Sequence, residues 1–408
     1  MRGSLSIPWF ALFLAAVTFA GQDNASTVLS LAAPPGQVGR YDKLELAIEV
    51  GRLYVHPFDP CEVQLDVLVT EPSGRSLMVP AFWGQDYERA DLVQGGKPVA
   101  WCYPQGTGSW KVRLAPTQLG RYVLRASLQD REGQVFSSPV TFECVASPGK
   151  GFLRASREDP RFFEFSDGQP FFAIGQNLAF IGQGQYVTIP KAEEIFGKLA
   201  ANGANFLRIW TCCEDWALAI EARKSAWVRS WTKESPVVVL PGSEGENPRR
   251  CVQLKGQDGA SLAATPSHPV ALRPSTAYVL TGQAKTEDCK TLRIQIGVKT
   301  LDVSPADWQP FELRFTTGPQ ERWLGRVTFT LLGHGAAWLD HLSLKEAAGG
   351  AELFWEADVN RPVRGYYNPL DCFLLDQIVE AARRDGIYLM LCAMTRDLYM
   401  DSLSKAGS

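Results

Sequence analysis

The sequence lacks the features of several common functional classes. Its histidines, His56, His268, His334 and His341, are scattered, and no two cysteines have Cys-x-x-Cys spacing, so we expect neither a metal nor a redox dithiol. The net charge is −3 with no basic block, which argues against nucleic acid as the main partner. Beyond the first twenty residues no run is apolar enough to span a membrane. The expected chain therefore has no cofactor, no metal, no nucleic-acid partner and no membrane span.

The first twenty residues have the pattern of a signal peptide. Arg2 is followed by an apolar run at 9–17, and Thr18-Phe19-Ala20 is a small-residue cleavage site before Gly21. We therefore expect a secreted or periplasmic protein with a signal peptide at 1–20. The 9 cysteines are consistent with an oxidising compartment, but their number is odd and their connectivity stays open.

A β-sandwich is predicted at residues 27–147. Apolar residues alternate at 44–50 and 63–69, with Pro- and Gly-containing turns between these segments, as in half-buried strands. Tyr122 follows the turn residue Gly120 in the manner of the tyrosine corner of immunoglobulin-like sandwiches.

The next segment, 152–216, predicts the start of an α/β barrel. A hairpin with an Asp167-Gly168 turn leads into a short strand that ends at Asn177. A helix-like run at 192–201, a small-residue turn and an apolar strand ending in Arg208 and Trp210 follow. Polar groups at the C-terminal end of a buried strand are how such a barrel presents its active site.

Many short alternating strands then replace the βα pattern. They occur at 277–281, 292–296, 311–315 and 327–331, and predict a second β-sandwich inserted at 217–350. Helical periodicity at 370–384, a stop at Asp385-Gly386 and a continuous apolar strand at 387–394 predict that the barrel resumes at 351–408 and is truncated after its third strand. The expected fold is therefore an immunoglobulin-like β-sandwich, then an incomplete (β/α)8 TIM barrel interrupted by a jelly-roll sandwich.

Several segments resemble known families. The first sandwich, through residues 57–60, 72–74, 79–82 and 110–116, resembles the DUF5060 immunoglobulin-like domain found ahead of secreted glycoside hydrolases. Residues 163–177, 202–210 and 385–391 look like the first strands of a cellulase-like clan A barrel. The insert, through 272–278 and 338–344, is similar to carbohydrate-binding modules of the galactose-binding-like jelly-roll type.

This resemblance implies roles for particular residues. In the clan, an Arg at the end of the second strand holds the nucleophilic carboxylate, and Arg208 is the matching position. The acid/base Glu follows the fourth strand in an Asn-Glu pair and the nucleophile follows the seventh. The chain has no Asn-Glu pair, and near Met394 it lacks the His that often closes the third strand. No catalytic residue is therefore assigned within this chain, and the carboxylates are expected beyond Ser408.

Five residues are predicted to contact a polysaccharide or oligosaccharide partner: Asn177, Arg208, Trp210, Trp216 and Trp323. For Arg208 a structural ion pair, and for Trp216 packing of the insert, are the competing interpretations. Trp308 and Trp338 are assigned to the core of the insert. The loop acids Glu214, Asp215, Asp397 and Asp401 fit helix capping better than catalysis.

The function expected from these features is the N-terminal portion of a secreted glycoside hydrolase, itself inactive for want of catalytic carboxylates. The alternative is a non-catalytic secreted carbohydrate-binding protein. A third possibility is an unstable gene fragment.

Overall fold

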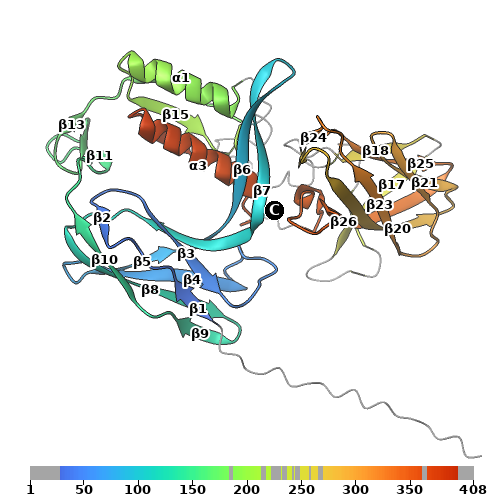
Figure 1. The fold of residues 1–408 in the computed structure, drawn as a ribbon, viewed down its shortest axis with the longest axis horizontal. Coiled ribbons are helices and arrows are strands. Elements are labelled where there is room, and N and C mark those ends of the chain that lie inside the picture. Colours follow the sequence, from blue (N-terminus) through green and yellow to red (C-terminus); the bar gives the residue numbers. More distant parts are fainter. Residues whose placement is uncertain are drawn as a thin grey trace, which may run out of the picture.

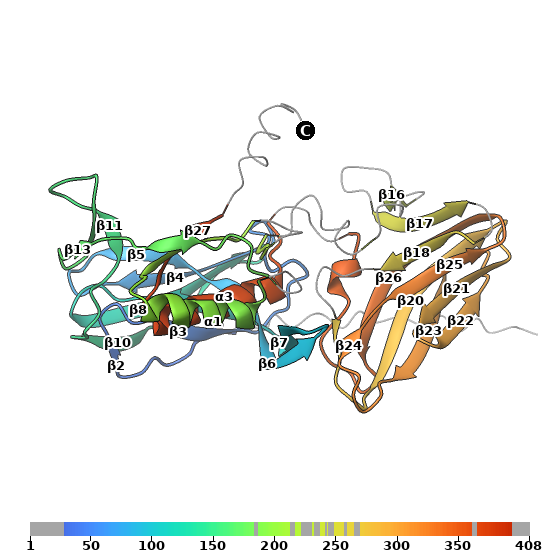
Figure 2. The same cartoon turned by 90° about the horizontal axis from the view of Figure 1, so that it is seen from above.

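The computed structural model describes residues 28–182, 187–212, 217–221, 231, 237–240, 243, 249–256, 259–264, 270–360 and 365–393. Two β-sandwiches lie side by side, and a small parallel sheet with two α-helices packs beside the first of them (Figures 1 and 2). A long two-stranded ribbon runs between these parts. No helix within the described ranges is long and apolar enough to cross a membrane.

The first sandwich is built from two sheets. One sheet has the order β1 (Leu29–Leu31), β3 (Leu44–Val50), β7 (Lys97–Leu114) and β6 (Phe82–Gln94). The other has the order β2 (Gln37–Gly39), β10 (Val140–Val145), β8 (Gly120–Asp130), β4 (Val63–Thr70) and β5 (Ser76–Pro80), with β9 (Gly133–Phe136) paired to β8. The apolar residues of β3 and β4 that alternate in sequence point into one core.

Tyr122 makes the contacts expected of a tyrosine corner. Its side chain is buried, and its hydroxyl accepts hydrogen bonds from the backbone N–H groups of Thr117 at 3.1 Å and Gln118 at 3.0 Å. The ring stacks on Phe142 with 5.0 Å between centroids. The corner therefore fixes the turn before β8, as the sequence pattern predicted.

Strands β6 and β7 continue beyond the sandwich as a ribbon. The turn between them is Gly95-Gly96, and both glycines have positive φ (57° and 77°), which a tight hairpin turn requires. Residues 99–103 of β7 are all buried. Ala100 and Cys102 belong to the core beneath the helices, whereas Trp101 and Tyr103 belong to the core of the second sandwich. Because side chains alternate along a strand, one strand serves two cores.

The helical part contains a three-stranded parallel sheet. Its strands are β14 (Gly175–Asn177), β15 (Phe206–Trp210) and β27 (Tyr388–Cys392), and its helices are α1 (Ile189–Ala201) and α3 (Pro369–Arg384). A small sheet precedes it, formed by β11 (Leu153–Ala155), β12 (Phe163–Phe165) and β13 (Pro170–Phe171). Asn368 starts α3 by accepting a hydrogen bond from the backbone N–H of Asp371 at 3.1 Å.

The predicted (β/α)8 TIM barrel is wrong. The described residues contain two α-helices and three parallel strands that could belong to such a barrel. Most of the remaining secondary structure consists of strands in multi-sheet β-sandwiches. The two helices contact each other and share one core with Leu207 and Ile209 of β15. The local patterns predicted these strands and helices, but a helix–turn–strand pattern does not fix how many units close around an axis. The predicted domain boundaries stay predictions.

The second sandwich is formed by the inserted residues. One sheet has the order β16 (Val237–Val239), β17 (Arg250–Gly256), β26 (Gly335–Glu346), β20 (Ala277–Glu287) and β23 (Gln309–Thr316). The other has the order β18 (Ser261–Ala264), β25 (Val327–Leu332), β21 (Thr291–Ile296) and β22 (Lys299–Val303). The short strands β19 (Val270–Ala271) and β24 (Trp323–Leu324) pair with each other, and a 3₁₀ turn follows at Trp355–Ala357.

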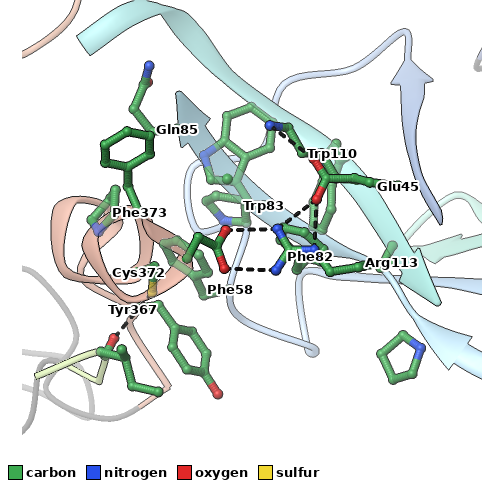
Figure 3. A pocket seen from close by; sticks show the side chains of 18 of the residues that line it. Glu45, Phe58, Phe82, Trp83, Gln85, Trp110, Arg113, Tyr367, Cys372 and Phe373 are labelled. Carbon is green, nitrogen blue, oxygen red and sulfur yellow. Dashed lines mark hydrogen bonds and ion pairs between the residues drawn. The ribbon is translucent and has the colours of Figure 1, made fainter. Parts of the chain in front are cut away.

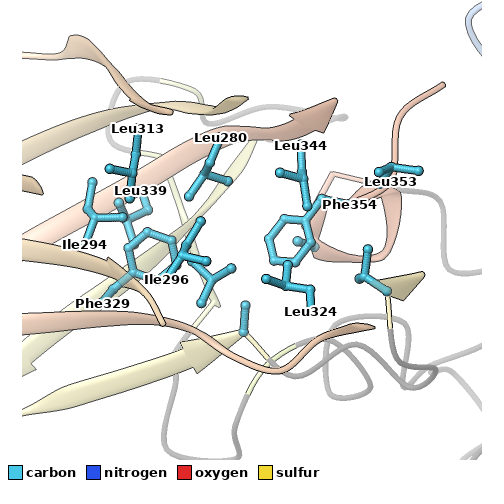
Figure 4. Packing of buried hydrophobic residues seen from close by; sticks show 14 of the residues in the cluster. Leu280, Ile294, Ile296, Leu313, Leu324, Phe329, Leu339, Leu344, Leu353 and Phe354 are labelled. Carbon is cyan, nitrogen blue, oxygen red and sulfur yellow. The ribbon is translucent and has the colours of Figure 1, made fainter. Parts of the chain in front are cut away.

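The core of this sandwich is filled by branched aliphatic and aromatic side chains from both sheets. Figure 4 shows Leu280, Leu313 and Leu339 of one sheet facing Ile294 and Phe329 of the other. Leu280, Ile294 and Phe329 are completely buried. Burial of this kind is the main stabilising contribution to the insert.

No disulfide joins the cysteines of the described chain. Burial raises the pKa of Cys102 to about 12 and that of Cys372 to about 12. Both thiols therefore stay protonated at neutral pH.

We expect replacement of Trp101 to loosen the ribbon from the second sandwich. Its side chain is 3% exposed, and its indole N–H donates to the carbonyl of Arg322 at 3.2 Å. Trp101→Ala should cost about 3–5 kcal/mol of stability because it removes a buried aromatic group. Thermal unfolding followed by circular dichroism measures this loss. Val93→Ala, at a position of the ribbon that is 77% exposed, is the control. An unchanged melting curve for Trp101→Ala would contradict the shared core.

We also expect the thiols to react unequally. At pH 8 a thiol with a pKa of about 12 is ionised to only about one part in ten thousand, and the thiolate is the nucleophile. A short iodoacetamide pulse followed by peptide mass spectrometry should label the exposed Cys61 and leave Cys102 and Cys372 unmodified. All three should be labelled after unfolding in guanidinium. Equal labelling in the folded protein would show that the helical part is not packed as described.

Candidate functional sites

The structure brings the predicted residues Asn177 and Arg208 together. Asn177 pairs with Arg208 across β14 and β15, and Arg208 pairs with Met390 of β27. These side chains lie on the face opposite the helices, since Leu207 and Ile209 point into the helix-covered core. Asn177 and Met390 are exposed, so this open face of the sheet is accessible.

Arg208 is held by a thiol and an indole. Its Nε donates a hydrogen bond to Cys392 Sγ at 3.1 Å, and its guanidinium carbon lies 5.2 Å from the ring centre of Trp210. The ring of Phe180 meets Trp210 edge-on at 5.4 Å. The Nε1 group of Trp210 is buried without a hydrogen-bond partner among the described residues. This cluster fixes the arginine over the sheet.

The open face carries no catalytic pair in the described part of the chain. Retaining glycoside hydrolysis needs two carboxyl groups about 5–5.5 Å apart. The residues in register with Arg208 are Asn177 and Met390, and neither has a carboxylate. The predicted contact residue Trp216 and the acids Glu214, Asp215, Asp397 and Asp401 lie outside the described residues. In addition, no group of His, Cys, Asp and Glu suited to a metal ion occurs in the described ranges.

Trp323 lies in the core region of the second sandwich. It pairs with the buried Ala271 across β19 and β24, and its half-buried ring packs against the core cluster. This placement favours a packing role over the predicted contact with a sugar ring.

Trp338 was assigned to the core from sequence, but the structure places it on the outer face of the five-stranded sheet. Its neighbours in β26, Ala337 and Leu339, are buried in the core, so the side chain of Trp338 points to the opposite face. The ring is partly exposed, and Lys285 Nζ lies 6.0 Å from its centre. An aromatic ring therefore stands in the middle of this sheet, on its outer surface.

Polar side chains flank this ring on both sides. Gln253 of β17 and Lys285 of β20 are the residues directly paired with Trp338. Gln283 lies two residues before Lys285 in β20 and therefore faces the same side of the sheet. The amides of Gln253 and Gln283 make no hydrogen bond to other described residues, which leaves their donors and acceptors available.

Beside Gln283, on β26, other side chains cover the outer face. There Asp340 is buried beneath Arg249, with Asp340 Oδ2 and Arg249 Nη2 3.1 Å apart, and the amide of Asn360 covers the same end. Burial raises the pKa of the Cys251 thiol to about 11, and the charge of the nearby Asp340 carboxylate contributes to this increase. Asp340 is thus out of reach of a ligand, whereas Trp338 is partly exposed.

Comparison with known proteins gives one family match. Residues 37–129 match a domain of unknown function, DUF5060, which covers less than half of the chain. No curated protein matches this sequence.

Among solved structures the neighbours include carbohydrate-binding modules and a glycoside-hydrolase-like protein. A family 16 carbohydrate-binding module is 19% identical, with 28% of this chain and 89% of that chain covered and a TM-score of 0.21. The module TmCBM61, solved with β-1,4-galactotriose, is 16% identical over 31% of this chain and 98% of that chain, with a TM-score of 0.23.

A protein from Bacteroides vulgatus ATCC 8482, described as a "putative glycoside hydrolase", is 12% identical with a TM-score of 0.37. It covers 88% of this chain, and this chain spans 41% of that protein. None of these likenesses by itself assigns an activity to this chain.

Proposed function

We propose that this protein binds carbohydrate through the outer face of the five-stranded sheet of its second sandwich. The observation that carries the proposal is the partly exposed ring of Trp338, which stands among polar side chains on a rigid sheet. The flat face of an indole is large and apolar, and the C–H groups of a sugar ring pack well against it.

The groups around the ring supply the polar half of such a site. Gln253 and Gln283 each offer an amide donor and acceptor, and Lys285 offers an ammonium donor. Sugar hydroxyls need both kinds of partner. Because these residues lie on paired strands, their backbone positions are fixed before a ligand arrives, so only side-chain freedom is lost on binding.

Binding is supported better than hydrolysis for the described part of the chain. Among the described residues, the neighbours of Trp338 named above carry no carboxylate and Asp340 is buried beneath Arg249. The described residues in register with Arg208 carry none either. A role as the N-terminal portion of a secreted glycoside hydrolase remains compatible with this proposal, because a binding sandwich would then hold the polysaccharide for a catalytic part elsewhere.

We expect Trp338→Ala to weaken carbohydrate binding at least tenfold, since it removes the central apolar contact of the site. Isothermal titration with cellotriose, xylohexaose and β-1,4-galactotriose measures the change. Phe136→Ala is the control, because this ring is 46% exposed on β9 of the first sandwich, away from this face. Equal affinity of wild type and Trp338→Ala for every oligosaccharide that binds would overturn the assignment of this face.

We further propose that the protein acts outside the cytoplasm, with residues 1–20 as its signal peptide. Expression in a bacterium with an intact secretion system should yield a mature protein that begins at Gly21, because Thr18-Phe19-Ala20 fits the cleavage pattern. N-terminal sequencing of the purified protein tests this. Recovery of uncleaved protein from the cytoplasm alone would contradict it.

A further inference from the structure

A cavity lies between the first sandwich and helix α3. Its volume is about 760 Å³, and strands β4, β6 and β7 form one wall while α3 and the residues just before it form the other. This size is within the range of small-molecule sites, which often occur where two structural units meet. The cavity is separate from both faces described above, since neither Trp338 nor Arg208 lines it.

Aromatic rings from both walls surround this cavity (Figure 3). Phe58 and Trp83 come from the first sandwich, and Tyr367 and Phe373 come from the helical side. Trp83 contacts Trp110 edge-on at 5.6 Å, and Phe58 contacts Tyr367 at 5.7 Å. Tyr367 is 43% exposed. The rings are therefore held in place by one another while part of their surface still faces the cavity.

The cations that line the cavity are already paired with carboxylates. Arg113 forms two hydrogen bonds of 2.8 Å with Asp376, as the dashed lines of Figure 3 show, and Lys43 contacts Glu380 at 2.6 Å. Lys111 contacts Asp86 at 2.6 Å. The lining has five acids (Glu45, Asp66, Asp86, Asp376, Glu380) and three bases (Lys43, Lys111, Arg113). No cation is left over for a phosphate or a carboxylate, so an anionic ligand is disfavoured.

Amide groups complete the lining. Gln64 lies on the sandwich wall and Gln377 on α3. Gln64 Nε2 donates to Asp66 Oδ2 at 2.9 Å and Gln377 Oε1 accepts from Arg89 at 3.4 Å, which leaves the oxygen of Gln64 and the NH₂ group of Gln377 for a ligand. Aromatic faces, amides and carboxylates, together with cations that are already paired, suit a ligand that has apolar faces and carries many hydroxyl groups.

We infer that this cleft is a second carbohydrate site, which takes an uncharged oligosaccharide segment between Trp83 and Tyr367. The choice of ligand class rests on the proposed function, but the site itself is independent of Trp338. Two sites on one chain would let it hold a polysaccharide by two contacts at once, which raises the overall affinity without any new interaction at either site.

The test uses the whole chain and two variants from opposite walls of the cleft. Tyr367→Ala removes an exposed ring from the helical wall, and Gln64→Ala removes an exposed amide from the sandwich wall. Phe136→Ala, at a ring that is 46% exposed on β9 away from the cleft, is the matched control. Each variant is made in the wild-type and the Trp338→Ala background, and its folding is checked by circular dichroism.

Titration with xylohexaose, cellotriose and β-1,4-galactotriose should show two binding events in the wild type and one in Trp338→Ala. In the Trp338→Ala background, Tyr367→Ala and Gln64→Ala should each weaken the remaining event about tenfold, which is about 1.4 kcal/mol. Phe136→Ala should leave it unchanged.

Other outcomes separate this inference from the proposed function. Loss of all binding in Trp338→Ala would overturn the second site and leave the first. Binding that Tyr367→Ala and Gln64→Ala weaken, but that Trp338→Ala does not, would overturn the first and leave the second. Absence of any binding by the wild type would overturn both. A concentration-dependent increase in mass that Tyr367→Ala abolishes in sedimentation would assign the cleft to a second copy of this chain and overturn the second site.

Discussion

The alternation of side chains in residues 99–103 of β7 is the constraint on which the arrangement of this protein depends. Ala100 and Cys102 enter the core under the helices, and Trp101 and Tyr103 enter the core of the second sandwich. The strand has no solvent-facing side in this stretch. A shift of register by one residue would send the two large rings into the helical core and leave two small side chains facing the sandwich, so the register is strongly specified.

Ion pairs reinforce this placement along the same ribbon. Arg89 of β6 contacts Glu193 of α1 with two hydrogen bonds of 2.8 and 2.7 Å, and Arg113 of β7 holds Asp376 of α3. Arg273 of the second sandwich contacts Glu88 at 2.9 Å. These pairs are half-buried or exposed and each contributes little alone. Their effect is to orient the helices and the insert against the ribbon, whose two strands also form a wall of the aromatic cleft.

Much of the local structure could be predicted from the sequence, because the decisive interactions lie close together along the chain. The hairpin at Asp167-Gly168, the end of α3 before Asp385-Gly386 and the corner at Tyr122 each depend on neighbours within a few residues. The ribbon could not be predicted in this way. Residues 99–103 have no polar face because two distant parts of the chain cover them. The barrel prediction was wrong for a similar reason, since the number of strands that close around an axis also depends on contacts between distant parts of the chain.

The unexpected positions of Trp323 and Trp338 have the same origin. In β26 the inward residues are Ala337 and Leu339 before an irregularity in the pairing with β20, and Leu344 after it. The inward-facing positions change from odd to even numbers at this irregularity, so the sequence pattern does not show which residues of the strand face inward. A tryptophan within this apolar pattern therefore resembles a core residue. Trp323 lies in a two-residue strand that sequence patterns treat as a loop, yet it packs on the core. Pairing partners, and not local hydrophobicity, therefore decide which ring lies on the outer face of the sheet.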